Sequence, residues 1–117
     1  MDTKLSDLAK RIRDFISERD WVQFHEPKDL AISLSLEASE VLEHFQWKSK
    51  EEIDEKELGK ELADVLYWVV LMSDNLGIKL GEVFEQKMQE NENKYPIEKA
   101  KGNKQKYTQL KNNNRDN

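Results

Sequence analysis

The chain has 117 residues, with 19 lysines and arginines against 24 aspartates and glutamates, a formal charge of −5 and no cysteine. This length suits one compact domain, and the lack of cysteine excludes a disulfide framework, a thiolate metal site and a cysteine nucleophile. The acidic balance argues against nonspecific DNA binding, so we expect no nucleic acid polymer as partner.

The first expected element is a helix over residues 3–19. Its apolar residues recur at helical spacing, and Asp2 or Thr3 could cap it; they are Leu5, Leu8, Ile12, Phe15 and Ile16. The same segment mixes charge with apolar residues at every turn, unlike a signal peptide, and no stretch reaches the roughly 18 apolar residues of a membrane span. We therefore expect a cytoplasmic protein without a membrane partner.

Three further helices are expected after an aromatic loop, RDWVQFHEPKD, that Pro27 separates from the second helix. The second helix is predicted over residues 28–47, the third over 52–76 and the fourth over 79–94. Between Leu62 and Met72 the only charge is Asp64, so the third helix should be central, and Gly77 is a typical stop signal. The pattern predicts an all-α fold of four helices.

The domain is expected to span residues 1–110, followed by a disordered tail over 111–117. Residues 1–93 contain 22 acidic and 12 basic side chains, whereas residues 94–117 contain 2 and 7. The closing run KNNNRDN has nothing to bury. A basic segment after an acidic body could cover an anionic small molecule, although a solvated tail is the favoured interpretation for the last dozen residues.

The second and third helices each contain two acidic residues three positions apart: Glu37 with Glu40, and Glu61 with Asp64. Such residues share a helix face, and a short charged connection should fold the two helices into an antiparallel pair. Four facing carboxylates repel one another unless a cation lies among them, and oxygen ligands suit Mg²⁺ or Mn²⁺. A solvated acidic face is the simpler alternative. A di-iron bundle would need Glu-x-x-His pairs, which are missing.

These motifs resemble the all-α nucleoside triphosphate pyrophosphohydrolases of the MazG-like superfamily, whose signature is ExxE, a spacer and ExxD. Within it the chain is most similar to the dCTP pyrophosphatase branch. The similarity extends over residues 3–110 and rests on RDWVQFHEP, LEASEVLEHFQWK, ELADVLYW and a KxxxNxxKYP pattern at residues 87–96. The resemblance implies a four-helix MazG-like bundle and an oligomer, most simply a homotetramer with pockets lined by more than one chain.

The resemblance further implies Mg²⁺-dependent conversion of dCTP, or a modified deoxycytidine triphosphate, to the monophosphate and pyrophosphate. Glu37, Glu40, Glu61 and Asp64 would hold the metal, and Glu40 would also activate water as the catalytic base. The implied substrate contacts are Trp21, His25, Trp47, Lys48, Trp68, Lys87, Asn91, Lys94 and Tyr95. Core packing is the simpler reading of the aromatic rings, and His44 is interpreted as structural.

Two departures from the family concern the specificity for the nucleobase and the binding of phosphate. Some relatives have a first-helix histidine near the pocket where this chain has Ile12, and Lys94 stands where arginine is frequent. Two alternatives therefore stay open. One is a dUTP-directed or broad-specificity enzyme on the same fold, and the other is a non-catalytic helical binding module.

Overall fold

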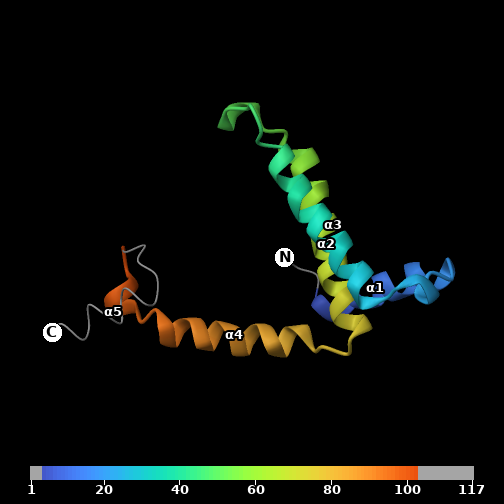
Figure 1. Cartoon of the computed structure of the whole chain (residues 1–117). Coiled ribbons are helices and arrows are strands. Elements are labelled where there is room, and N and C mark those ends of the chain that lie inside the picture. Colours follow the sequence, from blue (N-terminus) through green and yellow to red (C-terminus); the bar gives the residue numbers. More distant parts are fainter. Residues whose placement is uncertain (1–3, 103–117) are drawn as a thin grey trace. The chain divides into compact units, whose positions relative to one another are not determined.

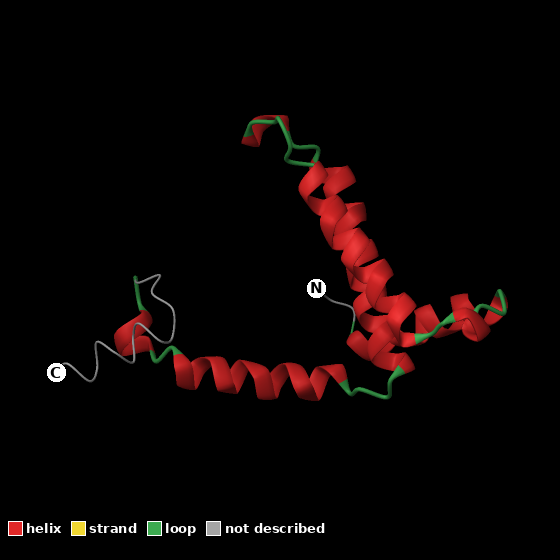
Figure 2. Ribbon diagram, in the orientation of Figure 1, coloured by secondary structure: helices red, strands yellow, loops and turns green. Residues whose placement is uncertain are grey.

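The computed structural model describes residues 4–102, and this part of the chain is helical with no strand (Figure 2). The chain divides into two compact units, Met1–Lys79 and Leu80–Asn117. The first contains α1 (Leu5–Glu18), η1 (Val22–Phe24), α2 (Pro27–Glu43), η2 (Lys50–Glu52) and α3 (Glu55–Asn75); the second contains α4 (Leu80–Lys94) and α5 (Ile97–Ala100). No helix in residues 4–102 is both long and apolar enough to cross a membrane.

The helix α1 begins after Lys4, and the caps expected at Asp2 or Thr3 lie outside the described residues. Its inner face packs on α3. Ile16, only 2% exposed, meets Leu71 of α3 and Leu30 of α2 in the core of the first unit. An ion pair between Arg13 and Asp74, at 2.5 Å, ties the exposed side of α1 to the end of α3.

The helix α2 starts with Pro27 in its first turn, where the missing backbone N–H has no helical partner to lose. It ends at Glu43, so the predicted end near Trp47 is wrong by about one turn. The N–H groups of His44 and Phe45 bond to carbonyls three residues back, which tightens the chain out of the helix. Trp47 then takes a left-handed conformation with φ of 63°, incompatible with continued helix.

The helix α3 has a side-chain cap at its N-terminal end. Asp54 accepts hydrogen bonds from the N–H groups of Lys56 and Glu57. The helix ends at Asn75, and Gly77 follows with φ of 70°, a backbone conformation in which glycine carries no steric penalty. The predicted bounds and stop signal of this helix are therefore confirmed to within three residues.

The first unit is built on a pair of long helices, α2 and α3, that lie side by side (Figure 1). The connection through η2 reverses the chain, so the two helices are antiparallel. As α1 also contacts α3, the prediction that the third helix is central is confirmed within this unit. Its Val70 and Leu71 are only 3% and 4% exposed.

In the second unit α4 ends at Lys94, just before Tyr95-Pro96, as predicted. The described residues contain five α-helices rather than the predicted four, because the short helix α5 follows α4 with Pro96 as its N-cap. The all-helical class is confirmed. The packing of four helices into one bundle and the disordered tail remain predictions, the latter because residues 103–117 lie outside the described part.

Candidate functional site

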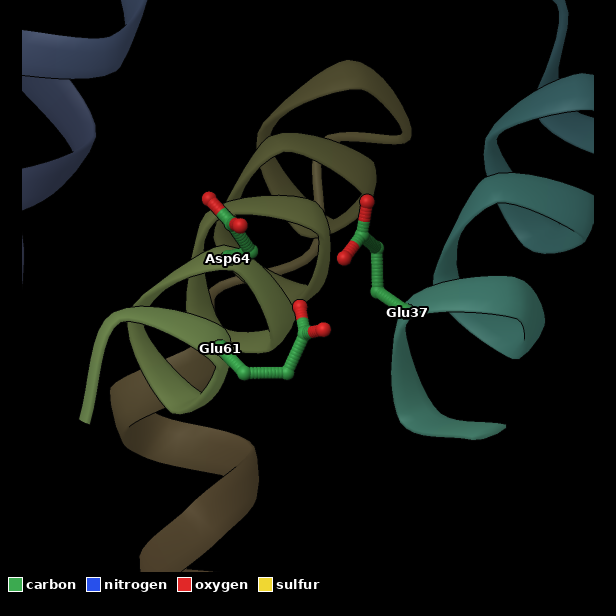
Figure 3. Close-up of side chains that lie close together, drawn as sticks. All are labelled: Glu37, Glu61 and Asp64. Atoms are coloured by element: carbon green, nitrogen blue, oxygen red, sulfur yellow. The ribbon is translucent and has the colours of Figure 1, made fainter. Parts of the chain in front are cut away.

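Three carboxylates of the first unit converge between α2 and α3. One oxygen each from Glu37, Glu61 and Asp64 lies within 4.8 Å of the other two. Glu37 reaches from α2 toward Glu61, and Asp64 stands one turn further along α3 (Figure 3). The i, i+3 spacing gives Glu61 and Asp64 a common helix face, and the antiparallel pairing of the two helices brings Glu37 opposite to them.

The cluster is electrostatically strained around Glu37. Its Oε2 atom is buried and has no hydrogen-bond partner among the described residues. The pKa of Glu37 is raised, chiefly by a hydrogen bond with the neighbouring Glu61 carboxyl that favours the protonated form, then by burial and by the charges of Glu61 and Asp64. A cation would remove this repulsion, and a set of carboxylate oxygens suits a hard divalent ion.

Glu40 lies one turn after Glu37 on α2 and is half-buried. It is not one of the three residues whose oxygens meet, although its side chain hydrogen-bonds with Glu37 and so acts to lower the pKa of that carboxyl. Its expected roles as fourth ligand and as catalytic base stay predictions. The structure therefore brings together three of the four acidic residues that the sequence indicated.

A cavity of about 480 Å³ opens beside the cluster. Two of the carboxylates line it together with aromatic rings from the loop and from α3; the lining comprises Arg11, Ile12, Phe15, Trp21, His25, Glu37, Asp64, Tyr67 and Trp68. Three of the predicted substrate contacts, Trp21, His25 and Trp68, are thus in one cavity with two predicted metal ligands. This cavity joins a negatively charged end to an aromatic end.

The aromatic end is a continuous chain of rings in edge-to-face contact. Phe15 meets Trp21 with ring centroids 5.7 Å apart and Tyr67 at 6.3 Å, while Tyr67 meets Trp68 at 5.0 Å. Burial raises the pKa of the Tyr67 hydroxyl. The His25 backbone carbonyl accepts a hydrogen bond from the Asn75 side chain at 3.3 Å, which ties the loop to the end of α3.

The other predicted contacts are elsewhere. Trp47 is 99% exposed, Lys48 is exposed, and neither lines the cavity. Four more belong to the second unit: Lys87, Asn91 and Lys94 on α4, and Tyr95 just after it. There Glu90 pairs with the lysines, 3.6 Å from Lys87 Nζ and 3.2 Å from Lys94 Nζ. Their predicted contact with substrate stays a prediction.

Sequence reasoning overlooked several residues at this site. Arg11, Phe15 and Tyr67 line the cavity. His44, interpreted as structural, has its Nε2 atom 3.8 Å from Glu61 Oε1, so it borders the acidic cluster. One signal was available for Arg11, because it lies one turn before Phe15 on the same helix face.

The MazG-like family model matches residues 32–110. The chain is 35% identical over 114 residues to dCTP pyrophosphatase 1 of Mus musculus, with 91% of this chain and 67% of that protein covered, and 34% identical to the Homo sapiens protein of the same name, with the same coverage.

A crystal structure of a pyrophosphatase from Archaeoglobus fulgidus superposes with a TM-score of 0.72 at 36% sequence identity, covering 82% of this chain and 95% of that chain. These similarities confirm the predicted enzyme class, a nucleoside triphosphate pyrophosphohydrolase. The matched segment contains all four predicted acidic residues, which start at Glu37. The chain belongs to the MazG-like family.

Proposed function

We propose that this enzyme hydrolyses dCTP, or a modified deoxycytidine triphosphate, to the monophosphate and pyrophosphate, with Mg²⁺ as cofactor and Mn²⁺ as second candidate. In a cell this reaction would clear such a nucleotide from the triphosphate pool. One observation carries the proposal: the carboxylates of Glu37 and Asp64 share a cavity with the rings of Trp21 and Trp68. A triphosphate with a bound cation and a flat base matches these two ends.

The residues present fit a divalent cation. Glu37 Oε2 is buried without a hydrogen-bond partner among the described residues, and Glu61 and Asp64 each place an oxygen within 4.8 Å of the Glu37 carboxylate. Glu37, Glu61 and Asp64 would hold the ion, and we include Glu40 as a fourth ligand from its place one turn along α2. A bound Mg²⁺ supplies Lewis-acid chemistry, which stabilises negative charge on phosphate oxygens.

Glu40 is the proposed general base. It is half-buried and lies next to the cluster, so its carboxylate can accept a proton from a water molecule that attacks the α-phosphorus. A new phosphorus–oxygen bond forms, the bond from that phosphorus to the oxygen bridging the α- and β-phosphates breaks, and pyrophosphate leaves. Glu40→Gln should therefore remove turnover while substrate binding persists.

The aromatic end would hold the nucleoside. Trp21 and Trp68 offer ring faces on which a base can stack, and His25 offers polar ring atoms near its edge. Trp47 and Lys48 are exposed, and we propose that they reach a nucleotide from a neighbouring copy. Lys87, Asn91, Lys94 and Tyr95 are the proposed contacts of the triphosphate, with the lysines as point charges.

The small core supports our proposal of a homo-oligomer, which we take to be a tetramer. Of the described residues only Ile16, Leu30, Val70 and Leu71 are buried apolar side chains, whereas Leu36 is 60% exposed and Phe84 58% exposed. Association would cover such surfaces. Sedimentation at micromolar concentration tests this, and a stable monomer would contradict it.

The activity itself is tested by incubating the purified chain with each common deoxynucleoside triphosphate, with and without Mg²⁺. We expect release of pyrophosphate, fastest with dCTP and absent without the cation. Release of single phosphate, or no turnover of any triphosphate, contradicts the proposal. Equal rates with dCTP, dUTP and dTTP would favour the broad-specificity alternative.

A further inference from the structure

Arg11 is the only lysine or arginine among the described residues that line the 480 Å³ cavity. Its side chain makes no hydrogen bond or ion pair with any described residue. The next arginines are engaged: Arg13 pairs with Asp74 at 2.5 Å, and the Arg19 guanidinium lies 3.8 Å from the centre of the Phe15 ring. Arg11 thus brings hydrogen-bond donors without a described partner to a cavity that also contains the carboxylates of Glu37 and Asp64.

The position of Arg11 in the cavity depends on where α1 packs on α3. It packs on the C-terminal half of α3, through Phe15 with Tyr67 and through Arg13 with Asp74. The acidic residues Glu61 and Asp64 lie in the N-terminal half of α3. Arg11 lies one turn before Phe15 on the same helix face, so we assign it to the aromatic end of the cavity, where the nucleoside lies if the triphosphate meets the carboxylates as the proposed function requires.

A guanidinium group only donates hydrogen bonds, and its paired N–H groups match two neighbouring acceptors. Cytosine presents such a pair, O2 and N3, on one edge. Uracil and thymine instead place an N–H at position 3, which opposes a donor. We propose that Arg11 is a specificity-determining residue that donates to O2 and N3 of cytosine while the base stacks on the rings of Trp21 or Trp68. This inference rests on the proposed function.

The kinetic test replaces Arg11 with methionine, which keeps most of the side-chain length but removes every donor. Pyrophosphate release from dCTP and dUTP is measured separately. We expect kcat/KM for dCTP to fall about 10- to 100-fold and that for dUTP to change less than about 3-fold. Lys10→Met is the matched control, since Lys10 is an exposed neighbour that does not line the cavity, and it should leave the dCTP/dUTP ratio unchanged.

Two kinetic outcomes overturn the inference. Equal losses with both nucleotides would mean that Arg11 binds phosphate, and no loss would mean that it does not touch the substrate. Arg11→Lys adds a second check, because it keeps the charge without the planar fork. Full dCTP selectivity in this variant would overturn the paired contact with O2 and N3, whereas reduced selectivity with normal helical circular dichroism supports it.

A binding measurement separates this inference from the proposed function. Tryptophan fluorescence is titrated with dCMP and with dUMP in the absence of a divalent ion, since Trp21 and Trp68 line the cavity. The unmodified protein should bind dCMP about 10-fold or more tightly than dUMP, and Arg11→Met should abolish the difference. If that pattern appears without hydrolysis of any triphosphate, the proposed function fails and the role of Arg11 stands. If dCTP is hydrolysed but Arg11→Met keeps the preference for dCMP, the opposite holds.

Discussion

Glutamates of α2 and α4 occupy opposite electrostatic environments. Glu37 on α2 faces two other carboxylates, and its pKa is raised. One of its oxygens is buried and has no hydrogen-bond partner within residues 4–102. Glu90 on α4 is exposed between two lysines, and its pKa is lowered by the hydrogen bond with Lys94 and by the charges of Lys87 and Lys94. The same residue type is thus driven toward its neutral form in one unit and toward its charged form in the other.

This contrast distinguishes the acidic cluster around Glu37, which favours binding of a cation, from the surface around Glu90, where lysines already balance the charge. A carboxylate with lysine partners is satisfied by the protein, and such exposed pairs contribute little to stability. The carboxylates of Glu37, Glu61 and Asp64 have no lysine or arginine partner among the described residues, and only the His44 imidazole lies near them, 3.8 Å from Glu61. Protons or a bound cation would offset their repulsion. The environment of Glu37, rather than the number of acidic residues on a helix, is therefore what favours a metal site.

The largest expected effect comes from Asp64→Asn, which removes a proposed ligand while keeping the side-chain volume. Turnover of dCTP should fall about 100-fold or more, because charge on the phosphate loses its stabilisation. Mg²⁺ should raise the melting temperature of the unmodified protein but not of the variant, since binding to the folded state stabilises it.

Glu43→Gln is the matched control, because Glu43 is exposed on α2 one turn after Glu40 and is not part of the cluster. It should keep turnover near the original rate. Loss of helical circular dichroism in Asp64→Asn would contradict the proposal, as it would mean that the carboxylate is structural. A full Mg²⁺-dependent thermal shift in Asp64→Asn would also contradict it.

A smaller effect is expected for Glu37→Gln in the presence of a chelator. Because the folded-state pKa of Glu37 is raised, its contribution to stability is fully present below the unfolded-state pKa and is lost as pH rises through the folded-state pKa. The variant should therefore melt a few degrees higher than the unmodified protein at pH 8, with little difference at pH 4. Thermal unfolding followed by circular dichroism measures both. A lower melting temperature at pH 8 would contradict this account of the cluster.

The helices and the acidic cluster were largely predictable, because both depend on local spacing. The i, i+3 pairs placed the carboxylates on helix faces, and the short connection made α2 and α3 antiparallel neighbours. The end of α2 was not predictable in this way. Apolar periodicity continues through Phe45 and Trp47, yet Trp47 has a φ of 63°, and periodicity carries no information about such a turn.

The residues at the aromatic end of the cavity were only partly predictable, for a different reason. Trp21, His25 and Trp68 were expected, but Arg11 and Tyr67 line the cavity because of how α1 crosses α3. That crossing is determined by long-range packing of Ile16 on Leu71, which helical spacing within one segment does not reveal. For Glu40 the sequence predicted too much. The motif groups Glu40 with Glu37, but no oxygen of Glu40 belongs to the cluster formed by Glu37, Glu61 and Asp64.

The smallest expected effect is that of Glu90→Gln, which tests the other side of the comparison. The pKa of Glu90 is lowered, so its stabilising contribution is present above its unfolded-state pKa and is lost as pH falls through the folded-state pKa. Since the residue is exposed, the melting temperature at pH 7 should barely change.

If Lys87 and Lys94 contact the triphosphate, removing their carboxylate competitor should lower KM for dCTP about 2- to 3-fold with kcat unchanged, and added salt should reduce the difference. Glu85→Gln is the control, because Glu85 lies on α4 without an ion pair to a described residue. A higher KM in Glu90→Gln would mean that Glu90 positions the lysines instead of competing for them, and the two glutamate environments would then both serve the nucleotide.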